Sequence, residues 1–147
     1  MSAAVVTSPP TTMAKEFQLS VVAPDRTVFE DNVESVVLPG VEGYMGVLAN
    51  HEPTIVALRP GIMEFKDNGG QRYFVSISGG FGEIADNKVI VLAENAQRST
   101  EIDVVQAEKA LEEARKALRG EPSSMTTDQA VEELELAQVR LKAARLN

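Results

Sequence analysis

Three glycines and the only histidine of this chain fall within one short stretch, LPGVEGYMGVLANHEP, which covers residues 38–53. Gly40, Gly43 and Gly46 recur at intervals of three, and His51 follows five residues later. Glycine at this frequency, in an otherwise apolar stretch, indicates a backbone whose turn or close approach a side chain would obstruct. The stretch therefore raises three possibilities: a ligand-binding loop, an active site, or a bend that presents its backbone to another protein.

The glycine spacing does not fit a phosphate-binding loop. GxxGxxG matches neither the GxGxxG of dinucleotide sites nor the GxxxxGK[ST] of phosphate loops, and no strand–helix–strand unit surrounds it. Ser78 precedes two glycines, and His51 could in principle serve it as a base. Ser76 and Ile77 precede Ser78, however, so the GxSxG nucleophile elbow is missing. We interpret His51 as structural and expect no catalytic residue and no activity of the chain's own.

Metal, redox and nucleic-acid chemistry also lack residues to support them. The 147 residues include no cysteine and one histidine, which argues against a zinc site and excludes disulfides and thiolate nucleophiles. Glutamate pairs such as Glu112–Glu113 and Glu132–Glu133 lie in segments with helical periodicity, where a solvated face explains them. The net charge of −8, with 5% aromatic residues and no tryptophan, is unfavourable for binding nucleic acid.

The hydropathy of the chain and its first residues indicate whether it could insert into a membrane or carry a secretory signal. No apolar run approaches the roughly 20 residues that span a bilayer, so we expect no direct membrane insertion. The opening MSAAVVTSPPTT has neither the basic start nor the long apolar stretch of a secretory signal. Its small, polar and proline-containing composition predicts a flexible tail over residues 1–14. Translation could begin at Met1 or at Met13, and the sequence leaves both open.

Residues 15–98 have the pattern of short β-strands. Phe17, Leu19 and Val21 share one face at period 2. Turns are predicted at residues 24–27, 68–70 and 86–87, and VFEDNVESVVLP suggests a break at Asp31–Asn32. Short strands with frequent turns predict an antiparallel sandwich or barrel.

From residue 99 to residue 147 the period becomes helical. Thr100 with Asp103 resembles a capping box for a first helix, which Gly120 would end. Thr126 with Gln129 makes a second capping box. Apolar residues recur at steps of three and four along both segments: Val104, Ala107, Leu111, Ala114 and Leu118, then Ala130, Leu134, Ala137, Leu141 and Ala144. The sequence thus predicts an α+β protein that ends in an antiparallel helical hairpin.

The composition of this helical seam matters for its stability. Two of the five seam positions in the first helix and three of the five in the second are alanine. A buried methyl contributes about 0.8 kcal/mol, against about 1.5–3 kcal/mol for a buried leucine. We therefore expect the hairpin to depend on another surface, either the sandwich or a partner, and to be able to move. The alternative is a static hairpin on the protein surface.

Several motifs, taken together, indicate which protein family the chain resembles. The pattern E-G-x-[LIM]-G, H-x-P, [KR]-P-G, S-G-G and A-E-x-A is met by residues 42–46, 51–53, 59–61, 78–80 and 93–96. In this order and spacing, the chain closely resembles the ε-subunit family of F-type ATP synthases, whose mitochondrial counterpart is called δ. The resemblance runs from about Phe17 to the C-terminus.

The resemblance implies a non-catalytic subunit of the proton-translocating rotor. Its sandwich would sit at the foot of the stalk, against the γ subunit and the ring of c subunits. The interface would include Glu42, Gly43, Tyr44, Met45, Gly46 and His51. Glu42 and Tyr44 would be the exposed contacts of the glycine turn, with His51 and Pro53 at its base. A bulky residue at Gly43 should then weaken assembly.

The resemblance also gives the hairpin a role. In bacterial relatives the two helices either fold against the sandwich or extend along γ toward the α and β catalytic subunits, where they impede hydrolysis. Some relatives bind ATP through an [IL]-D-x-x-R-A motif, which here corresponds to Ile102, Asp103, Gln106 and Ala107. Gln106 replaces the motif arginine, and a neutral amide cannot substitute for a guanidinium on phosphate.

We therefore expect weak or no ATP binding, to which Arg140 and Arg145 could still contribute, and no other cofactor. The implied location is peripheral, on the cytoplasmic side of a bacterial plasma membrane or on the energy-transducing membrane of an organelle. The alternative function is that of a free-standing sensor that binds adenine nucleotides.

Overall fold

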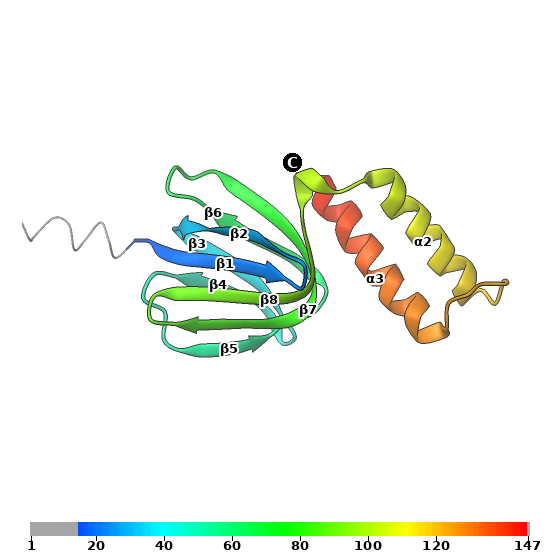
Figure 1. The fold of residues 1–147 in the computed structure, drawn as a ribbon, viewed down its shortest axis with the longest axis horizontal. Helices are drawn as coiled ribbons and strands as arrows, with labels where there is room; N and C mark the ends of the chain where they lie inside the picture. The colour runs from blue at the N-terminus through cyan, green and yellow to red at the C-terminus, as the bar shows by residue number, and fades with distance from the viewer. Residues whose placement is uncertain (1–14, 147) are drawn as a thin grey trace, which may run out of the picture.

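Within residues 15–146, eight strands are followed by a helical hairpin (Figure 1). The computed structural model describes residues 15–146, so the tail predicted over residues 1–14 lies outside the described residues. The strands are β1 (Phe17–Ala23), β2 (Arg26–Val33), β3 (Ser35–Gly40), β4 (Gly43–Leu48), β5 (Thr54–Ala57), β6 (Gly61–Lys66), β7 (Arg72–Ala85) and β8 (Lys88–Arg98). A 3₁₀ turn, η2 (Ser99–Glu101), leads into α2 (Val104–Leu118) and α3 (Thr127–Ala144).

The strands form one sheet that folds over on itself into a sandwich. Its order is β2-β1-β8-β7-β6-β3-β4, and β5 pairs with the second half of β7. Gly79 and Gly80 bend β7 between its two halves, with φ of +62° and +109°, in the region that favours glycine. The predicted α+β class and β-sandwich are confirmed. All pairs are antiparallel except β1 with β8, the first and last strands, which no hairpin turn constrains.

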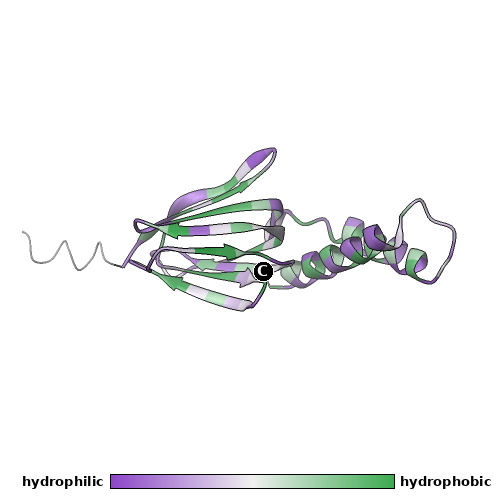
Figure 2. Cartoon of the chain, turned by 90° about the horizontal axis from the view of Figure 1, so that it is seen from below, coloured by the Kyte–Doolittle hydropathy of each residue, from purple (hydrophilic) through white to green (hydrophobic). Residues whose placement is uncertain are grey.

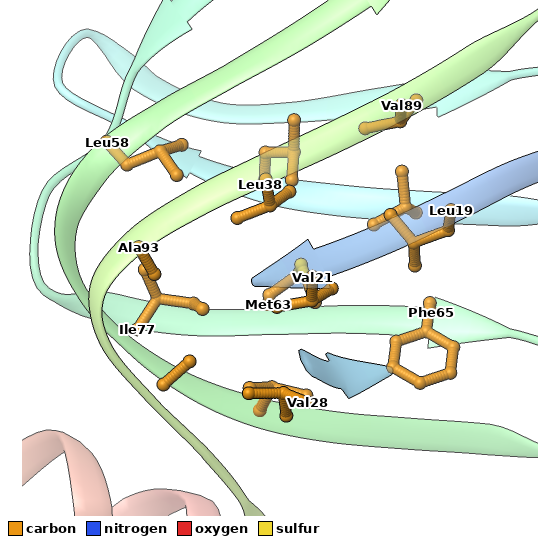
Figure 3. Packing of buried hydrophobic residues seen from close by; sticks show 14 of the residues in the cluster. Leu19, Val21, Val28, Leu38, Leu58, Met63, Phe65, Ile77, Val89 and Ala93 are labelled. Carbon is orange, nitrogen blue, oxygen red and sulfur yellow. The ribbon is translucent and has the colours of Figure 1, made fainter. Parts of the chain in front are cut away.

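The core lies between the two layers of the sandwich. Leu19 and Val21 have no exposed surface and Phe17 has 3%, as the period-2 pattern predicts. Figure 3 shows side chains from both layers, Leu19, Leu38 and Phe65 among them, meeting in this interior. The Phe65 ring lies 4.3 Å from that of Phe29 and 5.1 Å from that of Tyr73, measured between centroids.

The strand boundaries differ from the predictions in two places. The turn predicted at residues 24–27 covers only residues 24–25, because β2 begins at Arg26. The predicted turns at residues 68–70 and 86–87 are present, and both Asp86 and Asn87 have positive φ, at 52° and 58°. The predicted break at Asp31–Asn32 is wrong, because β2 runs through both residues and the chain leaves the sheet only at Glu34. Both side chains are exposed, and polar residues are compatible with a solvent-facing strand.

The helix starts show which capping predictions were right. The box of Thr126 and Gln129 is present, with hydrogen bonds of 2.9 and 3.1 Å. The first helix instead begins after Asp103, whose carboxylate accepts from the Gln106 N–H at 3.1 Å. Thr100 is not its cap, because residues 99–101 form the separate turn η2.

Small residues hold the hairpin together. The buried residues of α2 and α3 are Ala107, Ala114, Ala130, Ala137 and Ala143, and both helices interleave polar and apolar residues (Figure 2). Val104 and Leu118, which the seam pattern placed inside, are 44% and 40% exposed. The hairpin contacts the sandwich mainly through α3, which packs against β6 and β7 and also against η2. Helix α2 lies on the far side of α3 from the sandwich (Figure 1).

Candidate interaction surfaces and cleft

The glycine-rich stretch folds into the β3–β4 hairpin, with Val41 and Glu42 at its turn. Gly43 has φ of +137°, where side chains are strained. A Cβ on Gly40 would lie 2.8 Å from the Gly43 carbonyl oxygen, so this position also excludes a side chain. Gly46 has neither constraint, since a Cβ there would meet open space. The fold thus requires two of the three glycines and leaves the third unexplained.

Arg59 fixes the glycine turn in place. Its Nε donates to the Gly40 carbonyl at 3.2 Å, and its backbone N–H donates to the Pro39 carbonyl at 3.0 Å. Its guanidinium lies over the Tyr44 ring, 5.4 Å from the centroid. Glu42 and Tyr44 are both exposed, Tyr44 by 54%. The sequence contained a signal for Arg59 in the R-P-G motif, but Arg59 was not among the predicted site residues.

His51 lies away from this turn. Gly40 pairs with Gly43 at one end of the β3–β4 ladder and Ser35 pairs with Leu48 at the other, and His51 follows three residues beyond Leu48. The expectation that His51 lies at the base of the glycine turn is therefore wrong, because the length of β4 separates it from that turn. Pro53 directly precedes β5, whose residues 54–57 line one cavity together with residues 40–43.

The loop that carries His51 has contacts of its own. The Nδ1 of His51 is 2.8 Å from the Glu52 carbonyl oxygen. The loop is tied instead to the β7–β8 turn, where the Asn87 carboxamide accepts from the Asn50 N–H at 2.7 Å and donates to the Glu16 carbonyl at 2.8 Å.

An apolar face covers the outer side of β5, β7 and β8. Phe81 pairs directly with Leu92, and Glu83 pairs with Ile55 on one side and Ile90 on the other. The exposed fractions of Phe81, Leu92 and Ile55 are 58%, 56% and 72%, and that of Ile90 is 37%. We call these four residues, Ile55, Phe81, Ile90 and Leu92, the apolar face.

Sequence reasoning missed the apolar face, although KVIVLAE carries a signal for it. In that segment Val89 and Val91 are buried, yet Ile90 and Leu92 on the opposite side of β8 are equally apolar. Strands that are covered on both faces have this pattern. Within residues 15–146, however, no element buries the outer side of β8, on which Ile90 and Leu92 lie.

A cleft of about 540 Å³ lies between the sandwich and the hairpin. Four of the five residues predicted for a nucleotide site line it, namely Asp103, Gln106, Ala107 and Arg140, whereas Ile102 does not. Arg140 Nη2 donates to Asn95 Oδ1 at 2.9 Å. Among the described residues its Nε is buried without a hydrogen-bond partner, and burial lowers the pKa of the Arg140 guanidinium.

Acidic groups outnumber basic groups around this cleft. Four carboxylates line it against two guanidinium groups, the carboxylates being those of Asp25, Glu94, Asp103 and Glu133. One guanidinium, that of Arg26, is already paired with Glu101, at 3.1 and 3.4 Å. Its hydrogen bonds hold the pKa of the Glu101 carboxyl below the usual range, and the same partner raises the pKa of Arg26. The cleft is therefore poorly suited to a polyanion.

Residues 15–146 contain neither a group of metal ligands nor a helix that could span a membrane. Within that part of the chain, no three His, Cys, Asp or Glu side chains are grouped so that they could hold a metal ion. No helix of the same part is long and apolar enough to cross a bilayer.

Two family models together match nearly all of the described chain. The β-sandwich domain of the ATP synthase delta/epsilon chain matches residues 16–99, and its long α-helix domain matches residues 100–145. A sandwich followed by a helical hairpin is the architecture that these two models describe in sequence. The chain belongs to the ATP synthase delta/epsilon family, and the resemblance drawn from its motifs is confirmed.

Relatives and solved structures agree with this assignment. The ATP synthase epsilon chain of Syntrophomonas wolfei is 38% identical, over 87% of this chain and 93% of the relative. The ATP synthase epsilon chain of Desulforamulus reducens is 36% identical, over 90% of this chain and 99% of the relative. A chain of the Euglena gracilis mitochondrial ATP synthase, solved as OSCP/F1/c-ring, matches with a TM-score of 0.74 and 33% identity, over 90% of this chain and 82% of that one. A Tetrahymena thermophila central stalk/c-ring chain, 13% identical with a TM-score of 0.52, shares the fold.

Proposed function

We propose that this chain is the non-catalytic ε-type subunit of an F-type ATP synthase, which couples the c ring to the γ subunit in the rotor. Membership in the delta/epsilon family, and a solved relative within an F1/c-ring assembly, support the proposal. The observation that carries it is the apolar face, because a monomeric sandwich has no reason to expose Ile55, Phe81, Ile90 and Leu92 together. The γ subunit is the partner that we assign to this face.

Reconstitution with purified γ subunit tests the proposal. We expect a stable complex in gel filtration, with the apolar face protected from surface labelling. Failure to bind γ, alone or with the c ring, would contradict the proposal and favour the free-standing sensor.

The c ring is the second partner in this proposal, and it would meet the glycine turn. Glu42 and Tyr44 are exposed there and Arg59 holds the turn rigid, which suits a contact surface. His51 lies beyond the other end of β4, so we propose that the glycine turn and the His51 loop occupy different parts of the rotor interface, with the loop on the γ side. Gly43→Val is a poor test, because φ of +137° strains valine in the isolated chain as well.

The hairpin is the regulatory part of the proposed subunit. It meets the sandwich mainly through α3, whose buried residues are alanines, and Arg140 of α3 donates a hydrogen bond to Asn95 of β8. A buried alanine methyl contributes about 0.8 kcal/mol and a hydrogen bond about 0.5–1.5 kcal/mol, and stabilisation of this size favours a hairpin that can undock. Released helices would reach the α and β catalytic subunits and impede ATP hydrolysis. The complex would act as a peripheral assembly on the cytoplasmic side of a bacterial plasma membrane, or on an organelle membrane.

ATP is proposed to bind weakly or not at all in the cleft. Gln106 supplies no charge, Arg26 is engaged by Glu101, and four carboxylates repel phosphate. Arg140 is the one cleft cation without a carboxylate partner in the described residues, and its Nε is buried. No other cofactor is proposed.

Gln106→Arg is expected to strengthen ATP binding, which is weak or absent in the natural chain. A charge-assisted hydrogen bond contributes about 1.5–3 kcal/mol, which corresponds to a gain of about 10- to 150-fold in affinity. Isothermal titration with millimolar ATP measures it. Gln138→Arg, on an exposed position of α3, is the matched control and should bind no better than the natural chain. Micromolar affinity of the natural chain would contradict the account.

A further inference from the structure

A short connection, residues 99–103, joins the sandwich to the hairpin, and we call it the hinge. Strand β8 ends at Arg98, η2 covers Ser99–Glu101, and α2 begins at Val104. The backbone has only two soft dihedral angles per residue, so the conformation of so short a connection sets the direction in which α2 leaves the sandwich. The contacts that fix the hinge therefore help to decide where the hairpin lies.

Glu101, the last residue of η2, ties the hinge to the sandwich. Its Oε2 accepts from Arg26 Nη1 at 3.1 Å, and its Oε1 accepts from Arg26 Nη2 at 3.4 Å. The same Oε1 accepts from the Arg98 N–H at 3.2 Å, and the Glu101 carbonyl accepts from Gln97 Nε2 at 3.2 Å. Gln97 and Arg98 belong to β8, which the hinge follows directly, whereas Arg26 is the first residue of β2. Arg26 is therefore the partner that fixes Glu101 to a strand distant in sequence.

The Arg26 guanidinium contacts the hinge and the sandwich at once. Besides the two bonds to Glu101, its Nη2 donates to the Ala96 carbonyl of β8 at 3.2 Å. A guanidinium presents several N–H donors in a rigid plane, so a single side chain can make all these bonds. The guanidinium of Arg98 lies instead over two aromatic rings of the sandwich, 5.9 and 5.8 Å from their centroids. Arg26 thus joins β2, β8 and the hinge.

The rest of the hairpin is held to the sandwich by small contacts. Helix α3 packs against β6 and β7, its buried residues are alanines, and Arg140 donates to Asn95 at 2.9 Å. Helix α2 lies on the far side of α3 (Figure 1), and the cleft of about 540 Å³ leaves part of the space between sandwich and hairpin unpacked. Atoms that line an open space lack partners on one side and forfeit packing energy. The bonds of Arg26, which also lines the cleft, therefore carry a larger share of the docking.

We infer that the Arg26–Glu101 pair is a regulatory contact, which keeps the hairpin docked by fixing the hinge. While its bonds are made, η2 is held to β2 and α2 leaves the sandwich in the direction seen in this structure. When they break, the hinge loses its tie to β2 and can turn, so the hairpin undocks more often. The two side chains are 40% and 41% exposed, so water competes for both charges and the contact can open and reform. The inference rests on the proposed function, which gives undocking its regulatory meaning.

Single-molecule energy transfer in the isolated full chain measures the ratio of docked to undocked molecules. The chain has no cysteine, so dyes attach only at introduced cysteines, Asn68→Cys in the β6–β7 turn and Ser124→Cys in the loop between the helices, both at exposed positions. Arg26→Gln is expected to lower the ratio about three- to fivefold, the upper end of the range for an exposed ion pair. If one state dominates, urea below the unfolding midpoint of the sandwich brings the ratio into range, and variants are compared at equal urea.

Arg119→Gln is the matched control. It removes bonds of 2.8 and 3.4 Å to Glu121 and Glu112, which are as exposed as the pair at the hinge but lie at the far end of α2. The docking ratio should stay unchanged in this variant. An equal loss in the control would mean that charge, and not the hinge contact, sets the ratio, and would overturn the inference.

A double-mutant cycle shows whether Arg26 and Glu101 act together. Glu101→Gln should lower the docking ratio as much as Arg26→Gln does, and the double variant should lose no more than either single variant, because one contact is removed in all three. Arg26→Lys, which keeps the charge but not the planar fork, should lie between the natural chain and Arg26→Gln. Losses that add in the double variant, or unchanged docking in both single variants, would overturn the inference.

Inhibition of ATP hydrolysis separates this inference from the proposed function. At saturating concentration on an F1 complex that lacks its own ε subunit, the Arg26→Gln chain should inhibit more strongly than the natural chain, because its hairpin is released more often. A lowered docking ratio with unchanged inhibition would support the hinge contact and contradict the regulatory role of the hairpin. An unchanged docking ratio would overturn the inference whatever the inhibition.

Discussion

Leu92→Glu is expected to reduce affinity for the γ subunit about a thousandfold while leaving the isolated chain folded. Leu92 is 56% exposed in the isolated chain, so a carboxylate there stays in water. In the proposed complex it would be buried opposite Phe81. The loss of a buried leucine, about 1.5–3 kcal/mol, and the burial of an unpaired carboxylate, several kcal/mol, together exceed about 4 kcal/mol. Surface plasmon resonance with immobilised γ measures the change.

Val105→Glu is the control for this experiment. Val105 is 62% exposed on α2, so the same kind of change is made on a surface outside the apolar face. It should leave γ affinity within about twofold. Unchanged γ binding by the Leu92 variant would refute the assignment of the apolar face to γ.

Phe65→Ala is expected to destabilise the sandwich by about 3–5 kcal/mol. Phe65 has no exposed surface, and its ring contacts those of Phe29 and Tyr73. The surrounding strands cannot collapse into the space of a missing ring, so a cavity adds to the lost burial. The free energy of unfolding of a small domain is about 5–15 kcal/mol, so the variant should unfold at a much lower urea concentration.

Phe74→Ala tests whether the effect belongs to the core. Phe74 lies on the neighbouring strand β7, where it pairs with Glu64 and so faces away from Phe65. Its side chain is half-buried, and the Arg72 guanidinium carbon lies 5.5 Å from the centroid of its ring. We expect it to cost less than half as much as Phe65→Ala. An equal loss at the two positions would mean that Phe65 does not anchor the core.

Much of this fold follows from local patterns. Phe17, Leu19 and Val21 alternate in sequence and are buried together, because one face of β1 covers the core. Thr126 and Gln129 cap α3 through bonds that span three residues, which sequence spacing alone specifies. Features of this kind depend on neighbours along the chain.

What the sequence did not reveal depends on contacts between distant segments. Glu101 pairs with Arg26, 75 residues away, and helps to form η2, which displaces the helix start to Asp103. The parallel pairing of β1 with β8 joins the two ends of the sandwich, and no turn residue marks it.

Some residues of the candidate sites could likewise be predicted before the structure was known, and others could not. The family resemblance marked Asp103 and Gln106 as part of a nucleotide site to which Arg140 could contribute, and the cleft brings the three together. It could not show that β4 carries His51 away from the glycine turn, because nothing in the motif fixes the direction of the intervening residues. The apolar face was missed because its residues come from three separate strands.

The most direct test of the central claim is the ATP hydrolysis rate of a purified F1 complex that lacks its own ε subunit. The full chain, or a truncation after residue 100 that retains the whole sandwich, is added at saturating concentration. We predict that both bind, that the full chain inhibits hydrolysis, and that the truncation does not. Equal rates with either form would contradict the regulatory role of the hairpin, and absence of binding by both would contradict the rotor assignment itself.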